Sequence, residues 1–340
     1  MGPGEPFAFQ GTYRVQSKAR GKPSRLEGRW GVCEEGELDE ATVNQLLVSN
    51  PFWSGASRVQ LKPAFVIERD GEFAEEPDIL YKKSHFVPTC GGSAMPTNIV
   101  DVAKAATRWR EREPFLVALL GEAVYSQAAK LIGGLEGVVA NEYFVHEAGH
   151  CLGYDTERKY AQGYFQIAGK IAWPLIYVEE FRADLLSFGF AADLLGEHSA
   201  AAVFLYNVLL RLGVHLEGYA NGVPNPYGDI PFMLYSLLRK QGWVEPDTAH
   251  PGVLCVTSLV PADLIVLMRA SVAHCCYWLV QPEWLADTGT DAALVAARYH
   301  KRVLSDHHLV QEFKMICDTV VAGLSADRSS RLATGSEKPD

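Results

Sequence analysis

The sequence contains no cysteine pair spaced as Cys-x-x-Cys, although its 340 residues include seven cysteines. That spacing is typical of zinc ribbons and of redox-active dithiols, so neither is expected. The cysteines are also odd in number and scattered along the chain, which does not fit a disulfide framework. Free thiols persist where the environment is reducing, and we therefore expect a cytoplasmic protein.

Positive charge is scarce as well. The chain has 31 Lys and Arg residues against 41 Asp and Glu residues, and its formal net charge is -10. A protein that binds the phosphates of nucleic acid needs a basic patch, and the sequence shows none. No nucleic-acid partner is therefore expected.

Long uninterrupted apolar runs are missing too. The first residues, Met-Gly-Pro-Gly-Glu-Pro, are not followed by an apolar segment, so no signal peptide is expected. The most apolar stretch, 259–280, is interrupted by Pro261, Asp263, Arg269 and His274. These groups would be costly inside a bilayer, so we predict a buried helix there and no membrane partner.

The rest of the composition is typical of a globular protein, with 48% apolar and 21% charged residues. Residues 1–95 combine β-branched and aromatic segments with turn residues, and they predict a small mixed α+β region. From 96 to 324 the apolar residues recur with the period of a helix. We therefore predict a mainly α fold, α+β overall, with a helical metal-binding catalytic domain at 96–324 and a disordered tail at 325–340.

Turn residues and helix caps divide these regions into elements. In the first region we predict strands near 12–16, 59–68 and 79–87 and a helix near 38–48. In the second region, Thr97 or Asn98 is expected to cap the first helix, and Pro114 and Pro174 fit the first turns of two others. The predicted helices are, approximately, 97–112, 114–132, 135–152, 174–195, 199–212, 230–240, 261–279, 291–304 and 307–324.

The strongest functional motif is His146-Glu147-Ala148-Gly149-His150, inside the predicted helix 135–152. Residues i and i+4 of a helix lie on the same face, so both imidazoles can face one metal ion while Glu147 lies beside them. This is the arrangement of a zinc protease helix. The alternative interpretation is an amphipathic helix that carries two surface histidines.

A zinc ion held by two histidines needs a third protein ligand and keeps its fourth position for water. Glu180 and Asp184 lie four residues apart in the predicted helix 174–195. If this helix runs past the first one, Glu180 can reach the metal and Asp184 can accept a hydrogen bond from the back of a ligating imidazole. The two motifs together predict a zinc site with His146, His150 and Glu180 as ligands.

These motifs resemble the gluzincin metallopeptidases, in which HExxH is followed by a Glu on a second helix, and Glu180-x-x-x-Asp184 is similar to the pair in thermolysin-like members. The string Glu179-Glu180-Phe181-Arg182-Ala183-Asp184 also resembles the Glu-Glu-Cys-Arg-Ala-acid motif of the dipeptidyl peptidase III family, with Phe181 in place of Cys. That family has one more residue between its histidines, and the resemblance covers only about 141–195. It implies a zincin-like helical core with a gluzincin-type site, and not membership of that family.

In such a site Glu147 would be the general base, taking a proton from the zinc-activated water and passing it to the leaving group. The resemblance also implies a His or Tyr from a later segment that stabilises the oxyanion. His215 and Tyr219 lie four residues apart and share a face if that stretch is helical. We predict them as the candidates for this role.

Three charged neighbours of the motifs are expected to have structural roles. Glu142, one turn before His146, is expected to be a solvated charge, and Glu179 to be hydrogen-bonded locally or exposed. Arg182 is expected to pair with a carboxylate, because a cluster of buried acids needs a counter-charge.

Three functions are compatible with these motifs. The first is a zinc-dependent hydrolase that attacks the peptide or amide carbonyl of a short peptide or small substrate. The second is a zinc-dependent metabolic enzyme that acts on a non-peptide small molecule by hydrolysis, elimination or carbon–carbon cleavage. The third is a non-catalytic metal-binding protein, and Glu147 argues against it, because a structural site has no use for a base.

Overall fold

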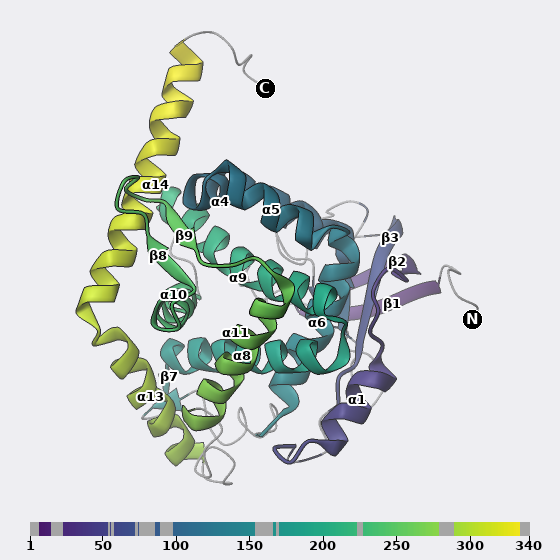
Figure 1. Cartoon of the computed structure of the whole chain (residues 1–340). Helices are drawn as coiled ribbons and strands as arrows, with labels where there is room; N and C mark the ends of the chain where they lie inside the picture. Colours follow the sequence, from purple (N-terminus) through teal and green to yellow (C-terminus); the bar gives the residue numbers. More distant parts are fainter. Residues whose placement is uncertain are drawn as a thin grey trace.

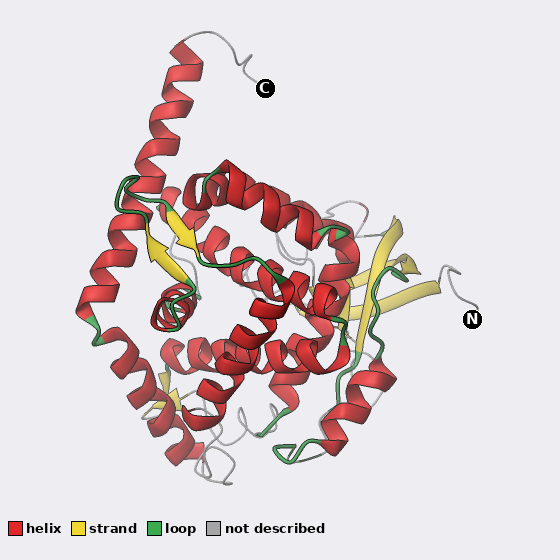
Figure 2. Cartoon of the chain, in the orientation of Figure 1, coloured by secondary structure: helices red, strands yellow, loops and turns green. Residues whose placement is uncertain are grey.

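The computed structural model describes residues 7–14, 23–53, 55, 58–71, 74, 86–88, 98–153, 166–167, 170–222, 227–278 and 289–333. Long helices form the body of the protein, and a five-stranded sheet lies along one side of it (Figure 1). Helices dominate the described residues, as Figure 2 shows, and the predicted fold class, mainly α and α+β overall, is confirmed.

The sheet is built from the N-terminal part of the chain. Its strands are β1 (Phe7–Arg14), β2 (Pro23–Val32), β3 (Leu61–Asp70), β4 (Phe86–Pro88) and β5 (Asn98–Asp101), in the order β1-β2-β3-β5-β4. β3 and β5 are parallel, and the other neighbours are antiparallel. Between β2 and β3 lies α1 (Glu40–Ser49), which is capped by Asp39, whose carboxylate accepts a hydrogen bond from the amide of Thr42 at 2.7 Å. Most of the predicted strand at 79–87 lies outside the described residues.

The start of the helical region differs from the prediction. The helix expected to begin at Thr97 or Asn98 begins at Val102, because the residues before it pair with β3 as strand β5. Asp101 caps this helix, α3 (Val102–Arg110), and its carboxylate accepts a hydrogen bond from the amide of Lys104 at 3.1 Å. The sheet therefore continues beyond residue 95, where the sequence pattern predicted the first region to end.

The remaining helices follow the predicted order. One difference is that the helix expected from Pro114 to residue 132 is divided into two at Gly121, which has a φ of 74°. Pro114, Pro174 and Pro231 lie in first turns, where a missing amide hydrogen costs no helical hydrogen bond. The helices are α4 (Glu113–Leu120), α5 (Glu122–Ile132), α6 (Leu135–Cys151), α8 (Trp173–Leu194), α9 (Glu197–Ala220), α10 (Ile230–Lys240), α11 (Pro261–Trp278), α13 (Gly289–Leu304) and α14 (His307–Ala333), accompanied by the hairpins β6–β7 (Gln166–Ile167, Lys170–Ile171) and β8–β9 (Val244–Pro246, Leu254–Val256).

The helix α9 lies in the middle of the helical body (Figure 1). Within the described part of the chain it is the one helix long and apolar enough to cross a membrane, but 72% of its most apolar 18-residue window is buried inside the protein. A buried core helix can be as long and as apolar as a membrane-spanning helix, and the burial of α9 fits a core helix. The apolar stretch at 259–280 forms α11, which buries Leu264, Met268 and Cys275 against the body but leaves Val266 70% exposed, so this helix buries one face only and is not fully buried as predicted.

The end of α14 corrects another prediction. A disordered tail was expected from Ser325, but α14 continues to Ala333 and extends away from the body (Figure 1). No Gly or Pro interrupts this stretch, and the hydroxyls of Ser325 and Ser329 donate to the carbonyls of Val321 and Ser325 at 2.9 Å each. Residues 334–340 lie outside the described residues.

Candidate metal centre

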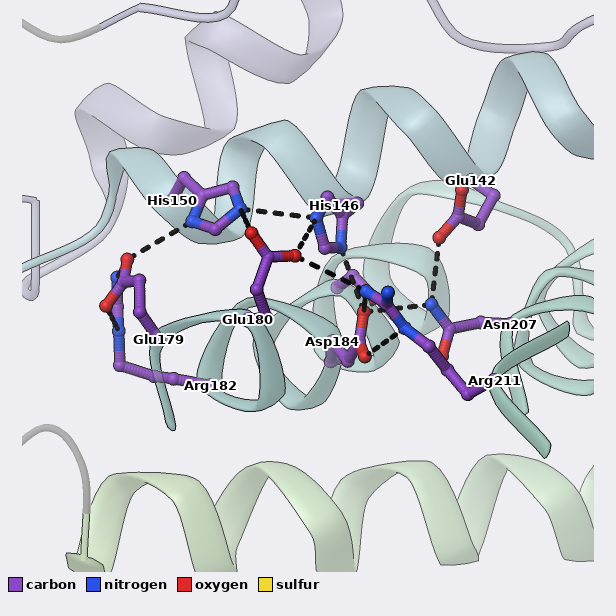
Figure 3. A network of polar contacts seen from close by, with 10 residues as sticks. Glu142, His146, His150, Glu179, Glu180, Arg182, Asp184, Asn207 and Arg211 are labelled. Atoms are coloured by element: carbon purple, nitrogen blue, oxygen red, sulfur yellow. Dashed lines mark hydrogen bonds and ion pairs between the residues drawn. The ribbon is translucent and has the colours of Figure 1, made fainter. Parts of the chain in front are cut away.

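The two sequence motifs meet where α6 crosses α8, and Gly149 allows the close approach of these helices. A Cβ atom at position 149 would lie 2.6 Å from the carbonyl oxygen of Ala183 and 2.9 Å from its Cα. Any other residue would push the backbones apart. Because Gly149 precedes His150 and Ala183 lies between Glu180 and Asp184, this contact brings the motif residues face to face (Figure 3).

We expect Gly149→Ala to lower the free energy of unfolding by about 1–3 kcal/mol, because the added methyl group overlaps backbone atoms that cannot rotate away. Zinc binding should weaken in the same variant, since a displaced α8 carries Glu180 with it. Urea unfolding and chelator competition measure the two effects. Gly323→Ala in α14 is the matched control, because a Cβ atom there would meet nothing within 4 Å. Equal stability of the two variants would show that the helix contact tolerates a methyl group.

Three potential ligand groups converge at the crossing. His146 Nε2 lies 3.2 Å from His150 Nε2, and the Glu180 carboxylate lies 3.5 Å from the first nitrogen and 3.8 Å from the second. One ligand atom from each residue lies within 4.8 Å of the other two. Figure 3 shows Glu180 pointing from α8 toward both imidazoles of α6. The structure therefore brings together the three residues predicted as metal ligands.

The opposite nitrogen of each imidazole is bonded to a buried carboxylate. His146 Nδ1 donates to Asp184 at 2.9 Å, and His150 Nδ1 donates to Glu179 at 3.1 Å. In a neutral ring, this bond keeps the proton on Nδ1 and leaves a lone pair on Nε2. The two Nε2 atoms then face one another beside the Glu180 carboxylate. Such an arrangement requires a cation between them, either a proton or a metal ion.

This set of donors fits zinc, which binds two histidines and a glutamate in catalytic sites. Burial alone would lower the pKa of His146, but hydrogen bonds to Asp184 and Glu180 and their negative charges raise it well above its usual range. A proton therefore competes with the metal ion for this position. Zinc affinity is expected to fall as pH falls, because a protonated imidazole cannot bind a metal.

Glu179 has a role that the sequence did not predict. It is hydrogen-bonded locally by Arg182, three residues further along α8, which agrees with one of the two alternatives expected for it, but it is only 4% exposed and also accepts a hydrogen bond from His150. The two hydrogen bonds from Arg182 measure 2.9 and 2.7 Å, which confirms the predicted pairing of this arginine with a carboxylate. Arg182 is fully buried and also donates to the carbonyl of Leu152 at 3.0 Å. Glu179 thus supports His150 as Asp184 supports His146.

Arg211 of α9 is a second unpredicted member of the centre. It donates through Nε and Nη2 to Asp184 at 2.8 Å each, and its Nη2 lies 3.5 Å from Glu180 (Figure 3). Burial alone would raise the pKa of Glu180, but the hydrogen bond to His146 and the charges of His150, His146 and Arg211 lower it to about 2. The pKa of Asp184 is held well below its usual range in spite of burial, mainly by Arg211 and then by His146. Both carboxylates are therefore ionised near neutral pH.

Glu142 is buried, with 5% exposure, and not solvated as predicted. Asn207 of α9 donates to Glu142 at 2.8 Å and to Asp184 at 3.0 Å, and burial raises the pKa of Glu142. Glu142, His146 and Asp184 also lie close enough to hold a metal ion. Asn207 and Arg211 already donate to the oxygens of Asp184, however, so we do not place the metal there.

The predicted catalytic residues are placed as follows. Glu147 is half-buried and lies one turn before His150 on α6. His215 and Tyr219 lie in the last turns of α9 and share a face, with ring centroids 6.0 Å apart. The Tyr219 hydroxyl donates to Asp318, and within the described part of the chain no hydrogen bond or ion pair joins His215 or Tyr219 to the metal centre. Their roles in catalysis stay predictions.

The fold and the centre together define a mainly helical protein in which two histidines of one helix and a glutamate of a second helix form a group that could hold a metal ion. No family model matches the chain, and no curated protein matches its sequence. Among solved structures, the fold is similar to that of DPP III from Caldithrix abyssi, with a TM-score of 0.55 and 12% sequence identity. The similarity covers 90% of this chain and 58% of that protein, so the chain spans little more than half of its length. At this identity the likeness concerns the fold alone.

The two supporting carboxylates should each contribute to metal affinity. We expect Asp184→Asn and Glu179→Gln to weaken zinc binding by about 10–100-fold, because each leaves an imidazole without its negatively charged partner. Competition with a chelator of known affinity measures the change. Asp193→Asn is the control on the same helix, because Asp193 is half-exposed and pairs with Arg269 at 3.0 Å. Zinc affinities equal to that of the control would show that the imidazoles do not need these partners.

Proposed function

We propose that this protein is a zinc-dependent hydrolase of gluzincin type, with His146, His150 and Glu180 as zinc ligands and Glu147 as general base. The observation that carries the proposal is the orientation of the imidazoles, which direct both Nε2 atoms to one point beside Glu180. Structural zinc sites have four protein ligands, whereas the described residues supply three here. A bound zinc ion would supply Lewis acidity and activate a water molecule.

The residues of the chain then have separate tasks. Glu147 takes a proton from the attacking water and returns it to the leaving group of the substrate. Glu179 and Asp184 keep the imidazoles in the tautomer that binds a metal. His146 and His150, and after them Arg211 at 3.5 Å, keep the Glu180 carboxylate ionised. The proposed reaction is attack of water on the carbonyl of a peptide or amide bond.

For the substrate, we propose a short peptide or a small molecule with an amide bond. The resemblance of the two motifs to gluzincin metallopeptidases supports a peptide, and the same residues would equally serve a non-peptide substrate. We further propose that the protein works in the cytoplasm. The free thiols of Cys33, Cys151, Cys255, Cys275, Cys276 and Cys317 support a reducing environment.

The first test is metal binding. Purified protein is expected to hold one zinc ion per chain, and Glu180→Gln should weaken zinc binding by more than about 100-fold, the upper end of the loss caused by removing a supporting carboxylate. Metal analysis and chelator competition measure both. Glu197→Gln at the start of α9 serves as a control in an exposed position. Retention of stoichiometric, tightly bound zinc by Glu180→Gln would rule out this ligand set.

A further inference from the structure

A second group of polar side chains lies next to the metal centre, and we call Tyr177, His215, Asp229 and His300 the Asp229 cluster. These residues come from α8, α9, the N-cap of α10 and α13. His300 Nε2 donates to Asp229 Oδ2 at 2.7 Å, and the rings of Tyr177 and His300 lie 6.4 Å apart. Burial and then the charge of Asp229 raise the pKa of Tyr177, and the same charge acts on His215. Asp229 is thus hydrogen-bonded to His300, whose ring lies beside that of Tyr177, and His215 lies within range of the charge of Asp229.

The cluster is one helical turn from the metal centre on two helices. Tyr177 precedes the ligand Glu180 by three residues on α8, and His215 follows Arg211 by four residues on α9. Arg211 itself lies 3.5 Å from Glu180. Side chains one turn apart are separated by about 5–6 Å at their Cβ atoms. A substrate whose carbonyl lies at the metal centre would therefore place a neighbouring group at the Asp229 cluster.

Several polar atoms of the cluster are available to a ligand. Within the described part of the chain, no hydrogen bond engages Asp229 Oδ1, the Tyr177 hydroxyl or the His215 ring. The side chain of Asp229 is 35% exposed, whereas that of His300 is 11% exposed. Asp229 stands at the N-cap of α10, but its side chain makes no capping hydrogen bond. Its carboxylate therefore does not cap the helix and is partly open to solvent.

Asp229 is the one acidic side chain of the cluster, which contains no lysine or arginine. Burial lowers the pKa of His215 in spite of Asp229, and burial raises the pKa of Tyr177, so both rings are neutral near pH 7. A ligand group with a positive charge and hydrogen-bond donors fits a carboxylate with one free oxygen beside a phenol.

We propose that the Asp229 cluster binds a positively charged ammonium or guanidinium group of the substrate next to the reacting carbonyl. This inference rests on the proposed function, because it assigns the cluster to the same substrate. Asp229 accepts hydrogen bonds from the cation, His300 holds the carboxylate in place, and the Tyr177 hydroxyl accepts a further hydrogen bond. In a short peptide the cation is either the amino terminus or a basic side chain.

Three hydroxamates, which bind zinc directly, separate these sources. N-acetyl-leucine hydroxamate is neutral, leucine hydroxamate has a free amino group, and N-acetyl-lysine hydroxamate has a basic side chain. Calorimetry with the zinc-loaded protein should show that at least one cationic probe binds about tenfold more tightly than the neutral probe, as expected for a hydrogen-bonded charge pair. The cationic probe that binds more tightly than the neutral one shows whether the amino terminus or the basic side chain is recognised.

Asp229→Asn should remove this preference and leave the affinity for the neutral probe within about twofold of the wild type. Asp306→Asn is the matched control, because Asp306 is 33% exposed and pairs with Lys240, and it should keep the preference. Equal binding of all three probes by the wild type, or a preference that persists in Asp229→Asn, would overturn the assignment. If Asp229→Asn does not fold, the affinities of the wild-type protein for the three probes still test the proposal. Failure of the neutral probe to bind would instead count against the zinc centre itself, on which both proposals depend.

Discussion

Glu147→Gln is expected to lower turnover by about 10²–10⁴-fold, the usual contribution of a general base. Glutamine keeps the size of the side chain and its capacity for hydrogen bonds, but it cannot accept a proton from water. Glu147 is not among the three ligand residues, so zinc content should stay at the wild-type level. Turnover should be measured on a panel of short peptide anilides and on non-peptide amides, which also separates the two substrate classes.

A matched control lies on the same helix. Glu136 is in the first turn of α6 and pairs with the exposed Arg110 at 3.1 Å, and exposed pairs contribute little to stability. Glu136→Gln should therefore turn over like the wild type. If Glu147→Gln holds zinc and keeps full turnover, the base is another residue. If it loses zinc, Glu147 is needed for the metal centre itself and the loss of activity says nothing about proton transfer.

The metal ligands could be predicted because their geometry is mostly local. The spacing of His146 and His150 puts both on one face of any helix, whatever surrounds it. The spacing of Glu180 and Asp184 likewise puts both acids on one face of the second helix. Their order along that face was enough to assign Glu180 as the ligand and Asp184 as the acid that supports an imidazole. The sequence could not show that the helices cross at Gly149, since that depends on the approach of Ala183 from a distant part of the chain.

The supporting residues were missed because their roles depend on that crossing. Glu179 is about 100° around the helix from Glu180, and only the angle between α6 and α8 turns it toward His150. Asn207 and Arg211 belong to a third helix whose position the sequence does not give. One pattern could have found them, because they are polar residues four apart within the apolar, buried stretch of α9.

The strands β5 and β2 were not predicted from the sequence for a similar reason. β5 is short and directly precedes a helix, and it is a strand because β3 pairs with it in parallel. β2 was not predicted because its sequence, Pro-Ser-Arg-Leu-Glu-Gly-Arg-Trp-Gly-Val, contains two glycines and little β-branched content, and it is ordered by pairing with β1 and β3. Strand content of this kind is decided by partners that lie far away in the sequence.

Arg182→Met is expected to lower the free energy of unfolding by about 3–5 kcal/mol. The variant keeps the length of the side chain but leaves the carboxylate of Glu179 buried without its counter-charge. The carbonyl of Leu152 at the end of α6 loses a hydrogen-bond donor as well. Urea unfolding of the zinc-free protein measures this loss without a contribution from the metal. Arg269→Met is the control, because Arg269 is half-exposed and its pairing with Asp193 should contribute little.

A double-mutant cycle separates the ion pair from the packing of Arg182. Glu179→Met combined with Arg182→Met removes both charges, and a buried pair replaced by apolar residues is often close to neutral. The double variant should therefore be more stable than Arg182→Met alone, although its zinc affinity should fall because His150 has lost its carboxylate. If the double variant is instead less stable by the sum of the single losses, Glu179 and Arg182 act independently. In that case Arg182 stabilises the protein through Leu152 and packing, and Glu179 needs no counter-charge to support the metal centre.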